Sequence, residues 1–347
     1  MLNRSLTKMI DNKKIYSAVV RIDDGSDSFS WSGAAGDMQL DNKYFIASVT
    51  KLYITAIVLQ LIDERKLDID QKISSYLPDQ FSSQLHVLKG IDYSNKLTVK
   101  HLISNTSGLP DYFFYKQKDG KTVADNLMGD KDEPWLLDRT INLIKELKPN
   151  FEPGRKGKVS YSDSNYQLLG RIIESVTNKK LHNVFNEYVF SKLDLQETYA
   201  YEDTNDNSPI PFYYKNRKLW LPNYMASITP EGGIVSTVDE VMIFLKAFFN
   251  GVFFSKEKIE ELKEWNLLFP PPGLFYFGIG LEKFWIPWFY SPFKPLGEVL
   301  GFWGQTGSFA FYSPKANLFF CGTTNQIDGT GHRLASELIL KVIKSAI

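Results

Sequence analysis

The chain has 347 residues, of which 43% are hydrophobic and 23% charged, as is ordinary for a globular protein. Its 40 basic and 40 acidic residues cancel. The chain therefore lacks the strong charge bias that is typical of nucleic-acid binders and of proteins that dock on anionic membranes. A chain of this length can bury a large core, and we expect one large domain with an inserted lobe.

Strands are predicted near both ends of the chain. Residues 15–22 are rich in β-branched side chains and residues 29–34 form a second strand after a turn. Residues 308–312 and 318–323 predict another hairpin, and residues 332–346 predict a helix with one apolar face. This pattern predicts an α+β fold, in which one antiparallel sheet of five or more strands is assembled from both ends and flanked by helices.

The middle of the chain is predicted to be helical. Residues 48–64 carry apolar side chains at the spacing of an amphipathic helix. Four further segments have helical patterns, namely 99–104, 135–147, 164–176 and 181–190. We therefore expect a mostly helical lobe, residues 61–229, inserted into a sheet lobe of residues 1–60 and 230–347. A cleft between two lobes is the usual place for a site.

Cysteine, histidine and apolar segments limit the other possibilities. Cys321 is the single cysteine and lies in an apolar run, which favours a buried strand residue and no disulfide. The four histidines lack the spacing of metal ligands, so neither a metal nor another cofactor is expected. The first nine residues lack the apolar stretch of a secretory signal, and no segment is long enough to span a bilayer. We expect a cytoplasmic protein with no membrane contact.

Ser48 and Lys51 form a Ser-x-x-Lys motif at the start of the helix predicted over residues 48–64. Side chains three residues apart on a helix are neighbours, about 5–6 Å between Cβ atoms, and the helix start favours nearby negative charge. A serine hydroxyl needs a base to become a nucleophile, and a lysine serves as one where its surroundings hold it neutral. The same pattern recurs elsewhere in the chain, so an N-cap serine with a solvated lysine is the alternative.

Tyr161 and Asp163 precede the helix predicted over residues 164–176. A phenol can relay a proton between nucleophile and leaving group when a neighbouring cation stabilises the phenolate. Asp163, two positions on, is expected to face the same side and to contact Lys51 or the substrate. For this motif alone, a packed tyrosine whose hydroxyl caps a helix is the alternative.

A glycine-rich segment, residues 301–309, leads into the strand predicted from residue 308. Glycines let a backbone come close to a ligand. A backbone N–H here, paired with that of Ser48, would bind the oxyanion of a tetrahedral intermediate. The alternative is a strand entry in which the glycines serve packing alone.

Taken in this order, the three elements resemble the serine β-lactamase and penicillin-binding-protein superfamily, and most closely its class C β-lactamase and esterase branch. The resemblance covers nearly the whole chain and is carried by residues 45–51, 99–110, 151–154, 161–163, 231–237 and 304–309. It implies that Ser48 is acylated, that Lys51 activates it and that Tyr161 is the general base or acid. The similar Tyr93 is excluded because the family's tyrosine follows the 99–110 stretch.

Two departures from the family pattern bear on the substrate. Asp163 stands where the family usually has asparagine. The third motif, Lys-Thr-Gly or His-Thr-Gly in the family, aligns with Phe302-Trp303-Gly304 and has lost its cation. In the family that cation helps to bind a substrate carboxylate, and a charge-assisted hydrogen bond is worth roughly 1.5–3 kcal/mol. Peptides ending in D-alanine and β-lactams are therefore expected to bind poorly.

The alignment of the third motif also decides which backbone N–H joins Ser48 in the oxyanion site. With the motif on residues 302–304, the donor is the N–H of Gln305. A rival alignment on residues 305–307 moves the donor to Ser308. Neither alignment provides a cation.

Aromatic side chains near the third motif favour an uncharged or apolar acyl group. We expect Phe302 and Trp303 to offer such a surface. A second cluster either extends this surface or packs as ordinary core, namely Trp285, Trp288, Phe289 and Tyr290. The expected substrate is thus a small-molecule ester, amide or peptide-like compound. No expectation follows for the oligomeric state.

Three functions follow from the sequence. The first is a serine hydrolase that forms an acyl-enzyme on an ester or amide. The second is a non-catalytic binder or sensor on the same scaffold, suggested by Asp163 and the lost cation. The third is a true β-lactamase or D-alanyl carboxypeptidase.

Overall fold

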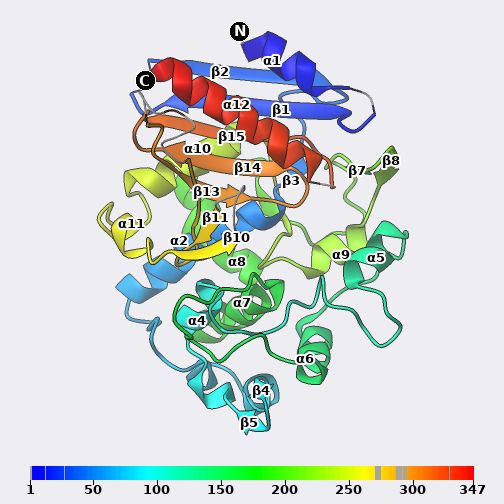
Figure 1. Ribbon diagram of the computed structural model, residues 1–347, viewed down its shortest axis with the longest axis vertical. Coiled ribbons are helices and arrows are strands. Elements are labelled where there is room, and N and C mark those ends of the chain that lie inside the picture. Colours follow the sequence, from blue (N-terminus) through cyan, green and yellow to red (C-terminus); the bar gives the residue numbers. More distant parts are fainter. Residues whose placement is uncertain are drawn as a thin grey trace.

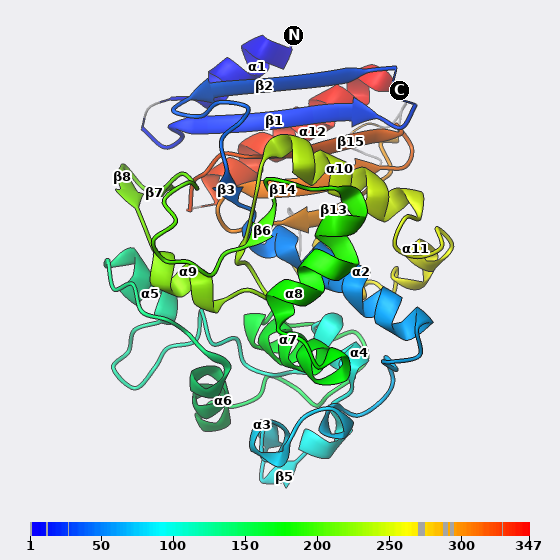
Figure 2. The same cartoon turned by 180° about the vertical axis from the view of Figure 1, so that it is seen from behind.

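A large antiparallel sheet organises the computed structural model. The structure describes residues 2–11, 13–26, 28–269, 275–286, 291, 295–327 and 329–347. Eight strands follow one another across this sheet in the order β10-β11-β12-β13-β14-β15-β1-β2 (Figures 1 and 2). Their bounds are β1 Ser17–Asp24, β2 Ser30–Gly36, β10 Asn266–Phe269, β11 Phe275–Phe277, β12 Glu282–Trp285, β13 Glu298–Trp303, β14 Ser308–Ser313 and β15 Leu318–Thr323.

The two ends of the chain meet in this sheet. β1 pairs with β15 in antiparallel register, with Val19 opposite Thr323 and Asp24 opposite Leu318. β1 and β2 form the first hairpin and β14 and β15 the second. The predicted α+β class and the sheet built from both ends are therefore confirmed, and the predicted strand over 318–323 has the observed bounds.

Helices cover both faces of the sheet. Helix α12 (Thr330–Ala346) and helix α1 (Leu2–Met9) lie on one face, and helix α10 (Val238–Asn250) lies on the other (Figures 1 and 2). Alternate residues of β13 point to opposite faces, as a strand requires. Phe302 packs in the core on the α10 side, whereas Trp303 packs with the α12 side.

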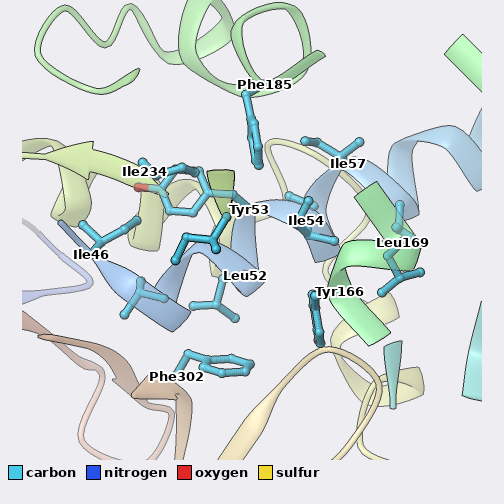
Figure 3. Close-up of a cluster of buried hydrophobic side chains, with 14 of the residues drawn as sticks. Ile46, Leu52, Tyr53, Ile54, Ile57, Tyr166, Leu169, Phe185, Ile234 and Phe302 are labelled. Carbon is cyan, nitrogen blue, oxygen red and sulfur yellow. The ribbon is translucent and has the colours of Figure 1, made fainter. Parts of the chain in front are cut away.

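Helix α2 (Thr50–Asp63) runs beneath the sheet and is buried on all sides. A short 3₁₀ turn, η1 (Ala47–Val49), leads into it, and every side chain from Thr50 to Leu61 is buried. The expected amphipathic helix is thus wrong in one respect, because α2 has no solvent face along most of its length. It lies between the sheet and the helical part of the chain (Figure 3). A helix in this position is apolar all round.

The middle of the chain is mainly helical, as predicted. The helices here are α3 Asp79–Ser82, α4 Val99–Ile103, α5 Val123–Met128, α6 Leu137–Glu146, α7 Asp163–Thr177, α8 Leu181–Phe185 and α9 Pro222–Ser227, and α11 Lys258–Glu261 follows α10. The predicted helix over 181–190 is α-helical only to Phe185 and continues as a π-helical turn to Phe190. The division into the two predicted lobes stays a prediction.

Small sheets complete the fold. A three-stranded sheet has the order β3 (Tyr44–Phe45), β9 (Ile234–Ser236), β6 (Tyr199–Ala200). Two hairpins stand apart, β4 (Val87–Leu88) with β5 (Ile91–Asp92), and β7 (Phe212–Tyr214) with β8 (Arg217–Leu219). Because β3 leads directly into η1, its pairing with β9 fixes the approach to α2.

Cys321 is a buried strand residue, as predicted. It lies in β15 with no exposed surface, and its Sγ donates to the carbonyl oxygen of Val238 at 3.3 Å. Burial raises the pKa of this thiol well above its ordinary value. Among the described residues, no helix is long and apolar enough to cross a bilayer.

Replacing Phe302 with alanine should lower the free energy of unfolding by about 3–5 kcal/mol, because the change leaves a cavity in a packed core. Urea denaturation of the purified protein measures this loss. Phe29→Ala is the matched control, since Phe29 is 41% exposed and its truncation should cost less than about 0.5 kcal/mol. Similar losses in the two variants would contradict the core position of Phe302.

Candidate active site

The backbone bends sharply just before Ser48. Ala47 adopts a left-handed conformation with φ of 47°, which a residue with a side chain rarely does. Such strain persists where the surrounding structure holds it, and it occurs often at functional sites. Here the turn is held by three hydrogen bonds: Ile46 N–H donates to Ile234 O at 3.0 Å, Ser308 Oγ to Ile46 O at 2.6 Å and Thr306 Oγ1 to Phe45 O at 3.2 Å.

Lys51 lies one turn after Ser48 with its side chain fully buried. Its Nζ donates to Ser48 Oγ at 2.9 Å and to the carbonyl oxygen of Glu231 at 2.8 Å, and it pairs with Asp163 Oδ1 at 2.8 Å. The lysine thus makes two hydrogen bonds and one ion pair with the protein. The solvated lysine of the alternative interpretation is therefore wrong.

Tyr161 reaches the same oxygen from the other side. Its hydroxyl donates to Ser48 Oγ at 2.9 Å, and its ring centroid lies 5.1 Å from Lys51 Nζ. Burial raises the pKa of this phenol well above its ordinary value, and the carboxylates of Asp163 and Glu282 raise it further. The structure thus brings together the three side chains that the sequence singled out.

Asp163 begins helix α7 and meets Lys51 directly, as the sequence predicted. Its backbone N–H donates to Asp111 Oδ1 at 3.1 Å. Burial, with Asp163 nearby, raises the pKa of Asp111 to about 7. Because aspartate replaces the family's asparagine at position 163, the carboxyl groups of Asp163 and Asp111 lie close together behind the nucleophile. Sequence reasoning missed Asp111.

Glu231 is a second buried acid that sequence reasoning did not single out as a side chain. Its Oε1 accepts a hydrogen bond from Tyr112 and another from Gln167 Nε2 at 3.3 Å. Burial and the nearby Asp163 raise the pKa of Glu231 well above its ordinary value. Because its carbonyl oxygen accepts from Lys51, this network fixes the position of the lysine.

Two backbone N–H groups near Ser48 have no acceptor within the described part of the chain: those of Ser48 and Gln305. Both residues line both cavities beside the nucleophile. Ser308, the donor of the rival alignment, lies in β14 and lines neither cavity among the residues described. Gly304 must be glycine, because a Cβ there would overlap Ser308 Oγ and approach Ile46 O to 2.6 Å.

Two cavities open onto Ser48. The smaller, about 60 Å³, is lined mainly by apolar side chains, among them Phe113, Leu127, Met225 and Ile228. The larger, about 390 Å³, has a second set of apolar residues, among them Phe114, Leu268, Phe275 and Trp303. The nucleophile therefore stands between two largely apolar spaces, one for each side of a bond that is cleaved.

Of the neighbouring residues Phe302 and Trp303, only Trp303 lines a cavity. Trp303 lines the larger cavity, as predicted, whereas Phe302 is fully buried against Phe277 and lines neither cavity. The expectation that Phe302 offers surface to a substrate is wrong, because the alternation of β13 turns it into the core. The residues Trp288, Phe289 and Tyr290, together with the Trp285 side chain, lie outside the described part of the structure.

Glu282 is a cavity residue that sequence analysis missed, because a single acid in the short strand β12 belongs to no motif. It is 6% exposed and lines the larger cavity, and its Oε2 accepts from the Trp303 N–H at 3.0 Å. Burial raises its pKa to about 8. Across the described residues, no group of three metal-ligating side chains is arranged to hold a metal ion.

The relatives of this chain in sequence and in structure show that it is a hydrolase of the serine β-lactamase and penicillin-binding-protein superfamily, as the sequence predicted. The family model described as Beta-lactamase matches residues 6–343, and the chain belongs to that family.

Two curated relatives are similar to this chain in sequence. The N-acetylmuramyl-L-alanine amidase of Bacillus subtilis (strain 168) is 25% identical over 320 residues, which cover 83% of this chain and 69% of the relative. The putative D-alanyl-D-alanine carboxypeptidase of Escherichia coli (strain K12) is 35% identical over 157 residues, which cover 45% of this chain and 33% of the relative. The second match therefore spans about a third of that relative's length.

Solved structures share the fold over almost the full chain. A D-stereospecific amidohydrolase from Streptomyces sp. has a TM-score of 0.79 at 22% identity and covers 96% of both chains. The D-amino acid amidase from Ochrobactrum anthropi SV3 has a TM-score of 0.77 at 19% identity, covering 99% of this chain and 100% of its own. EstCE1, a hydrolase with promiscuous acyltransferase activity, has a TM-score of 0.76 at 20% identity and covers 99% of both.

The raised pKa of Glu282 makes a prediction about stability. An unfolded glutamate ionises near pH 4.5 and the folded one near pH 8, so between these values the folded protein holds a proton that the unfolded chain has lost. This carboxyl therefore lowers the free energy of unfolding progressively as the pH rises from about 4.5 to about 8.

Glu282→Gln removes this loss and keeps an acceptor for the Trp303 N–H. Relative to the wild type, the variant should gain up to a few kcal/mol of unfolding free energy between pH 5 and pH 8. Urea denaturation at several pH values measures the difference. Parallel curves for the two proteins would show that the carboxyl ionises normally in the folded state.

Proposed function

We propose that the protein hydrolyses esters or amides through an acyl-enzyme on Ser48, and that its substrates lack a free carboxylate at the position where the family binds one. The observation that carries this proposal is the convergence on a single oxygen: Lys51 Nζ and Tyr161 OH both lie 2.9 Å from Ser48 Oγ. Nucleophilic serines are activated by such partners within hydrogen-bonding reach.

In the proposed reaction, the Tyr161–Lys51 pair first releases one proton to solvent, which leaves a neutral amine or a phenolate as the base. Ser48 Oγ then attacks the carbonyl carbon, and its proton passes to this base. The negative charge that develops on the carbonyl oxygen is held by the N–H groups of Ser48 and Gln305. When the tetrahedral intermediate collapses, the same pair returns the proton to the departing alcohol or amine. Water then attacks the acyl carbon, and Ser48 recovers its proton as the acid is released.

The charges around the site argue against a substrate carboxylate. Asp163 and Glu282 line the larger cavity, and no lysine or arginine of the described residues lines it. Lys51 is fully buried, and its Nζ makes hydrogen bonds to Ser48 Oγ and Glu231 O and an ion pair with Asp163. The names of the amidase relative and of the amidase structure agree with amide substrates, whereas the name of the carboxypeptidase relative keeps D-alanyl-D-alanine peptides as an alternative.

A non-catalytic sensor is the second candidate, favoured by the ion pair between Asp163 and Lys51, which engages the lysine that the family uses for activation. A fluorophosphonate probe separates the two functions when it is combined with substrate turnover. Rapid labelling together with ester turnover supports the hydrolase. Labelling without turnover of any ester or amide supports the sensor.

Ser48→Ala should abolish hydrolysis of p-nitrophenyl esters, with a loss of at least about a thousandfold in kcat/KM, because no other serine of the described residues lines either cavity. Stopped-flow absorbance and intact mass of the acylated protein measure this. Ser255→Ala is the matched control, since Ser255 and Lys258 form the same motif on the surface. Equal turnover by the wild type and Ser48→Ala would rule out the assignment.

Asp163→Asn should shift the rising limb of the kcat/KM pH profile to lower pH, by on the order of one unit. The physical reason is that Asp163 helps to raise the pKa of Tyr161, so its removal lets the phenol give up its proton more easily. Initial rates on an uncharged ester between pH 5 and pH 10 measure the profile.

Asp37→Asn serves as the control for this shift, because Asp37 pairs with Lys218 at the surface. An unchanged profile in Asp163→Asn, or a shift to higher pH, would show that proton transfer does not pass through Tyr161 in the way proposed.

A further inference from the structure

The larger cavity has the size and position to receive the acyl part of a substrate. Its volume of about 390 Å³ falls in the range of small-molecule sites, and it opens onto Ser48 and Gln305. Apolar side chains form most of its walls, with Phe114 and Phe275 among them. Such walls suit an aromatic or branched aliphatic side chain next to the carbonyl that is attacked.

One wall of this cavity carries a carboxyl group with unused hydrogen-bonding capacity. The Oε2 of Glu282 accepts from Trp303 N–H at 3.0 Å, and its Oε1 has no hydrogen-bond partner among the described residues. No cation of the described chain lies within ion-pairing distance of it. A carboxyl buried in this way is costly unless a ligand or a neighbour completes its contacts.

We infer that the larger cavity recognises substrates with an unblocked amino group near the scissile carbonyl, and that Glu282 binds this group as an ammonium. The inference rests on the proposed acyl transfer at Ser48 and names the class of its acyl group: an ester or amide of an amino acid with a free amine. The apolar side chain of that amino acid lies against Phe114 and Phe275.

Other residues of the same cavity favour a cation over an anion. Asp163 lines it and adds negative potential. Its partner Lys51 is buried, makes hydrogen bonds to Ser48 Oγ and Glu231 O, and does not line this cavity. The Trp303 ring lines the cavity beside Glu282, and aromatic rings attract ammonium groups. His332 also lines this cavity, and its Nε2 lies 2.8 Å from Gly304 O.

The protonation of Glu282 agrees with this role. Burial raises its pKa to about 8, so the carboxyl is largely neutral in the empty cavity near pH 7. An ammonium beside it favours the ionised form, which turns a neutral hydrogen bond into a charge-assisted one. Amine recognition therefore adds an ion pair at a carboxyl group that is only 6% exposed.

A kinetic test compares p-nitroanilides of phenylalanine, in both enantiomers, with those of N-acetylphenylalanine and 3-phenylpropionic acid. The wild type should prefer the better free-amine enantiomer by about 10- to 100-fold in kcat/KM over both amine-blocked and amine-free compounds. In Glu282→Gln this ratio should fall towards one. Glu298→Gln is the control, because Glu298 lies on neighbouring β13 and pairs with Lys263 outside the cavity, so its ratio should equal that of the wild type.

The inference can also be tested by measuring binding, which does not require that the protein hydrolyse a substrate. In the Ser48→Ala protein, calorimetry should find that 2-phenylethylamine binds at least about tenfold more tightly than 3-phenylpropionate, and Glu282→Gln in that background should remove the preference. Equal binding of the two probes, or tighter binding of the carboxylate, would overturn the inference. Amine preference in a protein that hydrolyses no ester or amide would instead overturn the proposed function and leave amine recognition supported.

Discussion

The buried ammonium of Lys51 is the interaction on which the rest of the site depends. A lysine without any exposed side-chain surface is tolerated only if its charge and its three protons are satisfied by the protein. The acceptors come from separate parts of the chain: Ser48 from the turn before α2, Asp163 from the start of α7, and Glu231 from the loop before β9. Meeting this requirement draws these three segments together around the nucleophile.

Carboxyl groups surround that single cation in excess. Asp111, Asp163, Glu231 and Glu282 all lie near the reaction centre, and burial raises the pKa of Asp111, Glu231 and Glu282. Protons held by the acids therefore keep the site from accumulating negative charge. The balance differs from that of a family member with asparagine at position 163 and a cation in the third motif. No lysine or arginine of the described residues lines the larger cavity, and this lining is the basis for proposing neutral or positively charged substrates.

The sequence predicted the fold class, the joining of the chain ends in one sheet and the convergence of Ser48, Lys51 and Tyr161, because each has a local signature: alternation, turn residues or motif order. It did not predict Glu282, because a lone acid in a short strand has no periodic or motif signal. It placed Phe302 in the cavity, which was wrong, because strand register decides which of two neighbouring aromatics faces the ligand.

The same limit explains the error about α2. Periodicity within residues 48–64 indicated a helix but could not show how many neighbours would cover it, since burial depends on partners far along the chain. The expected binding roles of Gly304, Gln305 and Asp163 depended on motif order, and the structure places all three at the cavities beside Ser48. Local sequence thus carried the positions of the reacting groups, whereas the charge of their surroundings emerged from tertiary packing.

The anchoring of the strained turn at Ala47 has a consequence for the timing of folding during synthesis. The hydroxyl groups of Thr306 and Ser308 donate hydrogen bonds to the carbonyl oxygens of Phe45 and Ile46 in this turn. Both residues leave the ribosome long after Ser48 does. β1 likewise waits for β15 before its second edge is covered. A nascent chain therefore carries its serine and lysine for most of translation without the geometry to use them, and hydrolytic competence arrives only with the last strands.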